Sequence, residues 1–371
     1  MDLTLTEDQQ LIASAARELL DSRAAVAGAR AVAGDPPGFS VRLWKELVEL
    51  GWTGLAFPAE YDGVGEGFGE LCLVIEELGR ARVPAPLTAT VACCGLPILA
   101  YGTEAQKAKW LGAITRGQVM TYVLGADAGV IGGVVGGGRG AGGRVVAEWS
   151  SGGFILDGEV PFVPYADAAD YLLVTARSSD GPVALLVDTV APGVAREALD
   201  VIADPLHRVR FSGVAVSPAR LLGDGTAAAI TAYGTAATCA EMVGGAQGVL
   251  DMTVAYARQR EQFGQPVGAF QAVAHHCANM AIDVLTSRFI AYEAIWRLAS
   301  GRDASQELSL AKSWVSEAYQ RVCALGHQVH GAIGFTAEHD LHYFSRHAMA
   351  SSLAFGDAAS HTERVAASLR L

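Results

Sequence analysis

Two long helical patterns are separated by Arg258-Gln259-Arg260-Glu261-Gln262-Phe263-Gly264-Gln265-Pro266-Val267-Gly268-Ala269-Phe270-Gln271. One pattern runs up to this stretch (Ala227–Arg260), one follows it (Ala269–Ser300), and a third covers Gln306–His330. The second pattern has one apolar face, made of Phe270, Val273, Ala274, Cys277, Ala281, Val284 and Leu285. Helices of this length must pack on one another, so residues 223–371 are predicted to form a C-terminal four-helix bundle domain, whose apolar faces often also serve oligomer contacts.

Composition changes twice upstream of this bundle. Residues 1–117 are predicted to form an N-terminal helical domain, which opens with a helix cap at Thr6. Residues 118–222 turn to short β-branched runs separated by glycine and proline, which predicts a middle β domain. These runs are Val119–Leu124, Tyr171–Val174, Val183–Val187 and Val214–Val216. The expected fold class is therefore α+β, in the order helical domain, β domain, helical bundle.

Charge and hydropathy exclude several kinds of partner. The 371 residues carry a net charge of −12, and no Lys/Arg run offsets it, so we expect neither nucleic acid nor anionic lipid as a partner. No apolar run reaches the roughly 18 residues that a bilayer span needs. The first residues also lack the basic and apolar pattern of a signal peptide, so we expect a cytoplasmic protein.

Cysteines, histidines and glycines give no metal or dinucleotide signal. The six cysteines show no CxxC spacing, and most lie in apolar helical runs where a thiol packs as a small hydrophobe. The pairs His327/His330 and His339/His342 have helical spacing but no further ligand beside them, so no metal site is expected. The glycine-rich stretch Gly129–Gly143 is not followed by a long helical pattern, as a dinucleotide-binding loop would be.

Several segments resemble the acyl-CoA dehydrogenase family. The stretch from Arg260 to Gln271 is similar to the family's RxxFGxxxxxxQ motif, and Gln328–Asp340 is similar to its QxxGGxGF segment. Leu43–Trp52 and Ala56–Gly65 match the family as well, so the resemblance covers nearly the whole chain. It implies the acyl-CoA dehydrogenase fold.

The resemblance also implies an FAD cofactor. By this resemblance, the residues that reach across a subunit boundary to a neighbour's FAD are Arg260, Gln262, Phe263 and Gln271, and those that contact its ADP part are Gln328 and Gly331. A buried pyrophosphate needs a fixed cation and several donors, which Arg260 and Gln271 can supply. The alternative is that Arg260 is a solvated helix-end cation and that the glutamines are surface amides.

The implied chemistry needs a carboxylate that this sequence lacks at the usual place. Removal of an α proton from an acyl thioester requires an Asp or Glu, while a flavin accepts the β hydride. Where the family places its Glu, this chain has Phe355 or Gly356, and at the position used by a minority it has Gly234. Two substitutes remain, Asp357 and Glu241. Asp357 could instead cap the final helix, and Glu241 could instead pair with an arginine.

The segments that would hold the chain's own flavin ring are altered too. Leu124–Gly129 replaces the TEPxxGSD-like segment, Glu159–Pro164 replaces the KxWIT segment, and Ala332 replaces the second glycine of the GG pair. Residues lent to a neighbour are thus kept, while those serving the chain's own flavin and base are lost.

This pattern favours a mixed oligomer. The sequence resembles the base-lacking subunit of α2β2 heterotetrameric actinobacterial members, some of which shorten steroid side chains. The implied partners are a related acyl-CoA dehydrogenase subunit, an acyl-CoA substrate and an electron-transfer flavoprotein. A self-sufficient homo-oligomer using Asp357 or Glu241, and a flavin-free scaffold subunit, remain as alternatives, and the acyl group stays open.

Overall fold

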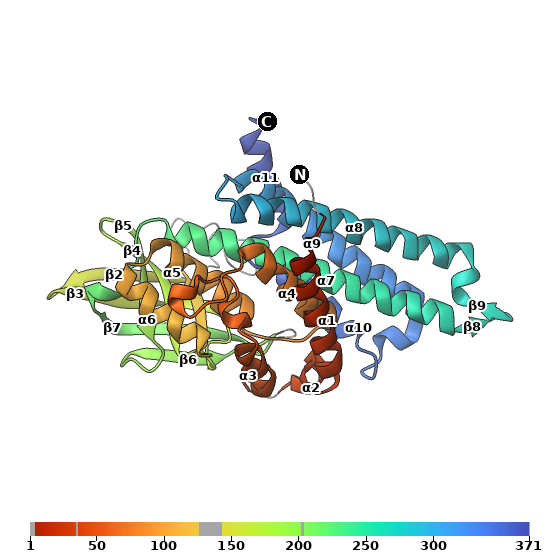
Figure 1. Cartoon of the computed structure of the whole chain (residues 1–371), viewed down its shortest axis with the longest axis horizontal. Helices are drawn as coiled ribbons and strands as arrows, with labels where there is room; N and C mark the ends of the chain where they lie inside the picture. Colours follow the sequence, from red (N-terminus) through yellow and green to blue (C-terminus); the bar gives the residue numbers. More distant parts are fainter. Residues whose placement is uncertain (1–3, 35, 126–142, 202–203, 371) are drawn as a thin grey trace.

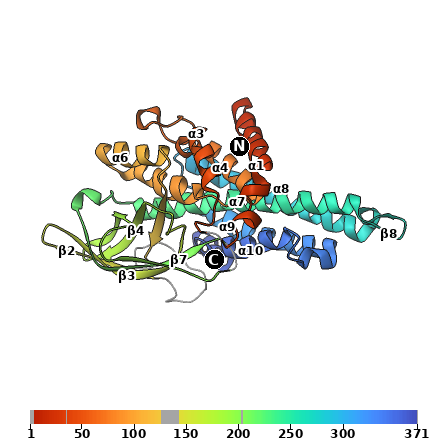
Figure 2. The ribbon, with the colours of Figure 1, turned by 90° about the horizontal axis from the view of Figure 1, so that it is seen from below.

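The computed structural model describes residues 4–34, 36–125, 143–201 and 204–370. Helices form the first part of the chain, strands the middle, and long helices the last, as the sequence predicts (Figure 1). The strands gather at one end of the elongated molecule, and the long helices extend to the other end in both views (Figures 1 and 2). Most of the glycine-rich stretch Gly129–Gly143, and positions 126–129 of the altered flavin segment, lie outside the described residues.

The N-terminal helices are built around α4. The predicted cap at Thr6 is confirmed, since its hydroxyl accepts the backbone N–H of Gln9 and the Gln9 side chain returns to the Thr6 backbone. The helices are α1 (Glu7–Ala27), α2 (Ala29–Val32), α3 (Val41–Glu49), α4 (Phe68–Ala81), the π-helical segment Thr88–Gly95, α5 (Leu96–Tyr101) and α6 (Glu104–Thr115). Most of α4 is buried, because it lies between α1 and the C-terminal helices.

A seven-stranded sheet forms the middle of the chain, in the order β1-β4-β2-β3-β7-β6, with β5 paired to β4. Its strands are β1 (Met120–Leu124), β2 (Arg144–Ser150), β3 (Gly153–Pro164), β4 (Tyr171–Ser178), β5 (Gly181–Asp188), β6 (Val194–Ala198) and β7 (Leu206–Val216). The register of β3 against β7 shifts between Val160 and Val163, and Phe162 within this bulge has a positive φ of 63°. A bulge re-aims side chains, and here it directs Phe162 into a cavity.

The C-terminal helices are α7 (Thr226–Gln259), α8 (Gln271–Ala299), α9 (Ser305–His330), α10 (Leu341–Leu353) and α11 (Ala358–Ser368). Helix α4 crosses α7 with backbones almost in contact, because both helices have glycine at the crossing. A Cβ atom at Gly244 would lie 1.8 Å from the Glu76 carbonyl oxygen, and one at Gly79 would lie 2.1 Å from the Glu241 carbonyl oxygen. This contact joins the N-terminal helices to the bundle and fixes the part of α7 that carries Glu241.

The apolar face predicted on α8 is only partly covered within the chain. Val284 is buried, whereas Leu285 is 52% exposed and its neighbours Ile282 and Phe289 are similarly open. The first half of α8 runs beside the end of α7 toward the tip of the molecule (Figure 1). An apolar helical surface of this kind is typical of an interface with another chain.

We expect His361 to make the fold sensitive to acid. Its Nε2 atom lies 3.0 Å from the Phe355 carbonyl oxygen, and burial lowers the pKa of His361 to about 4. A lowered pKa means that the neutral ring stabilises the folded state fully above the usual value near 6.5, and that this contribution is lost as the pH falls toward 4. His361→Gln should therefore give a shallower fall in the free energy of unfolding over that range, measured by urea denaturation. Equal slopes in the two proteins would contradict this expectation.

Candidate functional site

The tip of the bundle is a strained hairpin. Strands β8 (Glu261–Gln262) and β9 (Gln265–Pro266) pair on either side of Phe263 and Gly264, whose φ angles are 53° and 79°. Positive φ at both central residues is the geometry of a tight hairpin turn that favours Asn or Gly at the first of them. Phe263 instead occupies it with its side chain 93% exposed. A strained, fully exposed aromatic residue points to a function at this tip.

The two sequence motifs meet at this end of the bundle. Tyr256 near the end of α7 stacks on His330 at the end of α9, with ring centroids 4.5 Å apart. Arg260 therefore follows α7, and Gln328 and Gly331 lie at the end of α9, on adjoining helix ends. Gly331 has a φ of 64° and no atom within 4 Å of its would-be Cβ, so the chain leaves this position open.

The predicted cofactor residues are exposed and mostly unpartnered. All six of these residues lie on the surface: Arg260, Gln262, Phe263, Gln271, Gln328 and Gly331. Among the described residues, the Arg260 guanidinium and the Gln271 and Gln328 amides make no hydrogen bond or ion pair, while the Gln262 amide donates to the Glu261 carbonyl oxygen. An unpaired guanidinium and free amides next to a glycine are the donor set that a pyrophosphate binds, so these residues fit the ADP part of FAD.

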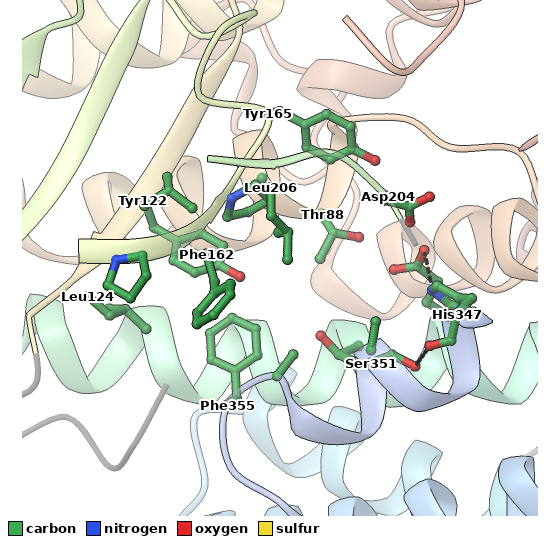
Figure 3. Close-up of a pocket in the computed structure, with 18 of the residues that line it drawn as sticks. Thr88, Tyr122, Leu124, Phe162, Tyr165, Asp204, Leu206, His347, Ser351 and Phe355 are labelled. Carbon is green, nitrogen blue, oxygen red and sulfur yellow. Dashed lines mark hydrogen bonds and ion pairs between the residues drawn. The ribbon is translucent and has the colours of Figure 1, made fainter. Parts of the chain in front are cut away.

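A second candidate site is a cavity of about 170 Å³ between the sheet and the helices. Its walls come from β1, the bulge of β3, the π-helical segment, α7, α10 and the turn after α10. Tyr122, Phe162 and Phe355 form one side, and in Figure 3 the rings of Phe162 and Phe355 face each other there. His347 and Ser351 lie on the other side (Figure 3). Apolar walls with a polar end are typical of a pocket for a small organic ligand.

Glu241 and His347 form the polar end of this cavity. The Glu241 carboxylate lies 3.3 Å from His347 Nε2, and the other ring nitrogen of His347 lies 3.4 Å from the Tyr319 hydroxyl. The second Glu241 oxygen has no hydrogen bond with any residue in the described ranges. Glu241 thus presents a free acceptor to the cavity. Its nearest partner is the His347 ring, not the arginine that the sequence leaves open as an alternative.

A second carboxylate reaches the same cavity. Asp204 lies 2.5 Å from an Arg82 nitrogen. Burial tends to raise the pKa of Asp204, but the Arg82 guanidinium outweighs that effect and holds the pKa below its usual range. Asp204 therefore stays ionised and paired.

The two positions that the resemblance implies for the carboxylate, Phe355 or Gly356 and Gly234, lie close together. Phe355 is buried, with its ring 5.3 Å from that of Tyr122. A Cβ atom at Gly234 would lie only 2.2 Å from Cζ of Phe355. The phenyl ring thus packs directly on the α7 backbone, and no side chain at position 234 can share that space.

Asp357 lies outside the lining of the cavity. Its carboxylate accepts the backbone N–H of Ser360 at 2.9 Å, as a helix cap does at the start of α11. This hydrogen bond lowers the pKa of Asp357. Of the two substitutes for the missing base, only Glu241 faces the cavity.

The two candidate sites lie far apart on one chain. The hairpin β8–β9 is at one end of the molecule and the strands that wall the cavity are at the other, in both views (Figures 1 and 2). One chain therefore cannot bring its own hairpin to its own cavity.

Two protein-family models match most of the chain. The model described as "Acyl-CoA dehydrogenase, N-terminal domain" matches residues 6–118, and "Acyl-CoA dehydrogenase, C-terminal domain" matches residues 223–370. The chain belongs to the acyl-CoA dehydrogenase family. The fold is likewise the acyl-CoA dehydrogenase fold, as the sequence resemblance implies.

Named relatives span the full chain. It is 29% identical to acyl-CoA dehydrogenase FadE27 of Mycobacterium tuberculosis over 98% of both chains. A chain in the crystal structure of the ChsE4-ChsE5 complex from the same organism superposes with a TM-score of 0.91 at 28% identity, covering 100% of this chain and 99% of that one. Butyryl-CoA dehydrogenase from Megasphaera elsdenii superposes with a TM-score of 0.89 at 25% identity, covering 100% of both chains.

Other residues of this acyl-CoA dehydrogenase fold give no signal in the sequence. His347, Phe162 and Lys312 reach the cavity or its walls only through packing between distant segments.

The histidine pairs hold no metal-ligand set, since no group of three or more His, Cys, Asp or Glu side chains gathers in the described part of the chain. No helix within the described ranges combines the length and apolar character of a membrane span.

We expect Gly234→Ala to destabilise the fold by clashing with Phe355. Overpacking of this kind costs about 1–3 kcal/mol. Phe355→Leu should relieve most of that cost, giving a coupling of about 0.5–3 kcal/mol in a double-mutant cycle measured by chemical denaturation. As a control, Gly69→Ala places its Cβ in open space and should be neutral or stabilising. Additive effects at positions 234 and 355 would show that the ring does not depend on the glycine.

Proposed function

We propose that this chain is a subunit of an FAD-dependent acyl-CoA dehydrogenase, lends the ADP-binding residues at its bundle tip to a neighbour, and relies on a related partner chain for the catalytic carboxylate. The substrate is an acyl-CoA thioester, dehydrogenated between its α and β carbons. We place the enzyme in the cytoplasm, with an electron-transfer flavoprotein as the electron acceptor.

The observation that carries this proposal is the contact between Phe355 and Gly234. A carboxylate must reach the α proton of the substrate, and the family resemblance implies two places from which it can do so. In this chain a phenyl ring occupies one of them and excludes a side chain from the other. The base of a working active site must then come from another chain or from elsewhere in this cavity.

The surface of the bundle supports a partner chain. Phe263 and the free Arg260 guanidinium lie at the hairpin that follows α7, and the exposed apolar residues Ile282, Leu285 and Phe289 lie further along α8. A lone chain would expose this apolar surface to water, whereas a second chain would cover it. Two structural relatives are named as pairs, the ChsE4-ChsE5 complex and a variant of the Tcur3481-Tcur3483 steroid ACAD, and the second has a TM-score of 0.89 and 29% identity.

The residues of this chain would bind and orient the cofactor. The Arg260 guanidinium would donate to pyrophosphate oxygens, and the Gln271 and Gln328 amides would hold the rest of the ADP part. Phe263 would pack an apolar ring against the cofactor and exclude water. FAD, when bound, would supply the acceptor for the β hydride. The partner's carboxylate would take the α proton.

Co-expression with the related chain provides the first test. The complex should carry flavin whose absorbance bleaches with acyl-CoA, whereas the chain purified alone should carry little.

Arg260→Ala removes a charge-assisted hydrogen bond worth about 1.5–3 kcal/mol, so flavin affinity of the complex should fall roughly tenfold or more. The matched control is Arg258→Ala, which removes an exposed arginine two residues earlier and should change affinity less than about twofold. Equal losses in the two variants would refute the role of Arg260, and a complex without flavin absorbance would favour a scaffold subunit.

A second candidate function is self-sufficient dehydrogenation with Glu241 as the base. The observation in its favour is the free Glu241 oxygen at the polar end of the cavity, with His347 behind it. If Glu241 is the base, Glu241→Gln should lower turnover more than about a hundredfold. Asp357→Asn is the matched control, since Asp357 caps α11 outside the cavity. Under the partner-dependent function that we propose, Glu241→Gln leaves the turnover of the complex within about tenfold of the unaltered protein.

A further inference from the structure

A lysine is buried behind the wall of the cavity. Lys312 on α9 is 0% exposed, and its Nζ atom donates to Ser316 Oγ at 3.0 Å, to the Ser352 carbonyl oxygen at 2.8 Å and to the Gly356 carbonyl oxygen at 3.0 Å. These contacts use all three N–H groups of the ammonium. Two of them cross from α9 to the end of α10 and the turn that follows it.

That turn carries Phe355 in a strained conformation. Phe355 and Gly356 have φ angles of 58° and 103°. Such a backbone is unfavourable for a bulky residue such as phenylalanine, and it persists only where surrounding contacts hold it. From the α11 side, the His361 ring donates to the Phe355 carbonyl oxygen. From the α9 side, Lys312 donates hydrogen bonds to the carbonyl oxygens of Ser352 and Gly356 on either side of Phe355.

Lys312 is unusual for a buried lysine because no carboxylate in the described ranges pairs with it. The ionisable groups whose charges act on it are Cys239 on α7, Asp357 in the turn and His361 on α11, and Arg364 contacts the far side of the His361 ring. None of these lies within ion-pair distance of its Nζ in the described chain. Burial lowers the pKa of Lys312 to about 8, which shows that the site disfavours the charge. A methionine of similar length would avoid that penalty, so packing alone does not explain a lysine here.

We infer that Lys312 is a positioning residue that latches the turn between α10 and α11, so that the Phe355 ring stays seated on Gly234 and closes that side of the chain's own cavity. Without the latch, the carbonyl groups of Ser352 and Gly356 lose their donor, and the strained turn can relax. The ring would then leave the α7 backbone.

This inference deepens the proposed function, on which its biological meaning rests. If the chain's own half-site has no base, a substrate bound there would be unproductive. A latched phenyl ring closes the side of that half-site next to Gly234, so we expect acyl-CoA to be directed to the cavity of the partner. The latch itself is a property of this chain and is measurable without flavin or partner.

The test separates local order from global stability. Lys312→Met removes the donors and also the buried charge, so the free energy of unfolding should stay close to that of the unaltered protein, while amide hydrogen exchange at residues 353–357 should rise about tenfold or more. Ser316→Ala is the matched control, because it removes an acceptor on α9 but leaves both contacts to the turn. Its exchange at residues 353–357 should stay within about twofold of the unaltered protein.

A third variant tests the ring itself. Phe355→Ala deletes the ring with the latch intact, so full-length protein should gain binding of indole, detected by saturation-transfer NMR, at least about tenfold over the unaltered chain. Lys312→Met should gain indole binding as well. Unchanged exchange at the turn in Lys312→Met would overturn the latch, and unchanged indole binding in Phe355→Ala would overturn the closed cavity. Neither outcome bears on whether Arg260 binds FAD in a partner complex, so the two proposals can fail separately.

Discussion

The contact between the Phe355 ring and the α7 backbone at Gly234 determines which side chains can line the cavity of this protein. Two segments more than a hundred residues apart in sequence meet there with no room for another heavy atom. Because a side chain at position 234 cannot occupy the same volume, this end of the cavity holds a phenyl ring and, among the described residues, no carboxylate. Tyr122 and Phe162 extend the apolar side of the cavity, and Glu241 and His347 lie at its polar end.

The shape of the molecule adds a second constraint. The donors that suit a pyrophosphate lie at the tip of the bundle, on the opposite end from the cavity. Under the proposed function, one rigid chain serves two different sites, because its own tip cannot reach its own cavity. The exposed apolar side of α8 and the strained, exposed Phe263 both cost free energy in an isolated chain. Under the proposed function, a second chain would bury both.

The sequence predicted much of this architecture for physical reasons that act locally. Helical periodicity located α7, α8 and α9 to within a residue or two, and the Thr6 cap marked the start of α1. The β-branched runs found β1, β4, β5 and the end of β7. Strands β2 and β3 gave weaker signals, because glycine, charged residues and a bulge interrupt their alternation. The apolar face of α8 was read correctly as apolar, yet periodicity could not say whether the chain itself would cover it.

By itself, the sequence determined the order of helices and strands. It also predicted the motif residues from Arg260 to Gly331 and the lack of a carboxylate at the two positions that the family resemblance implies. These are properties of residue types and short spacings, which survive without a structure. The tertiary structure alone decided that Phe355 and Gly234 meet, that Glu241 faces the cavity while Asp357 caps a helix, and that the Lys312 ammonium donates to the turn between α10 and α11. Such facts depend on how side chains from distant segments fill a common volume, and no local pattern encodes that.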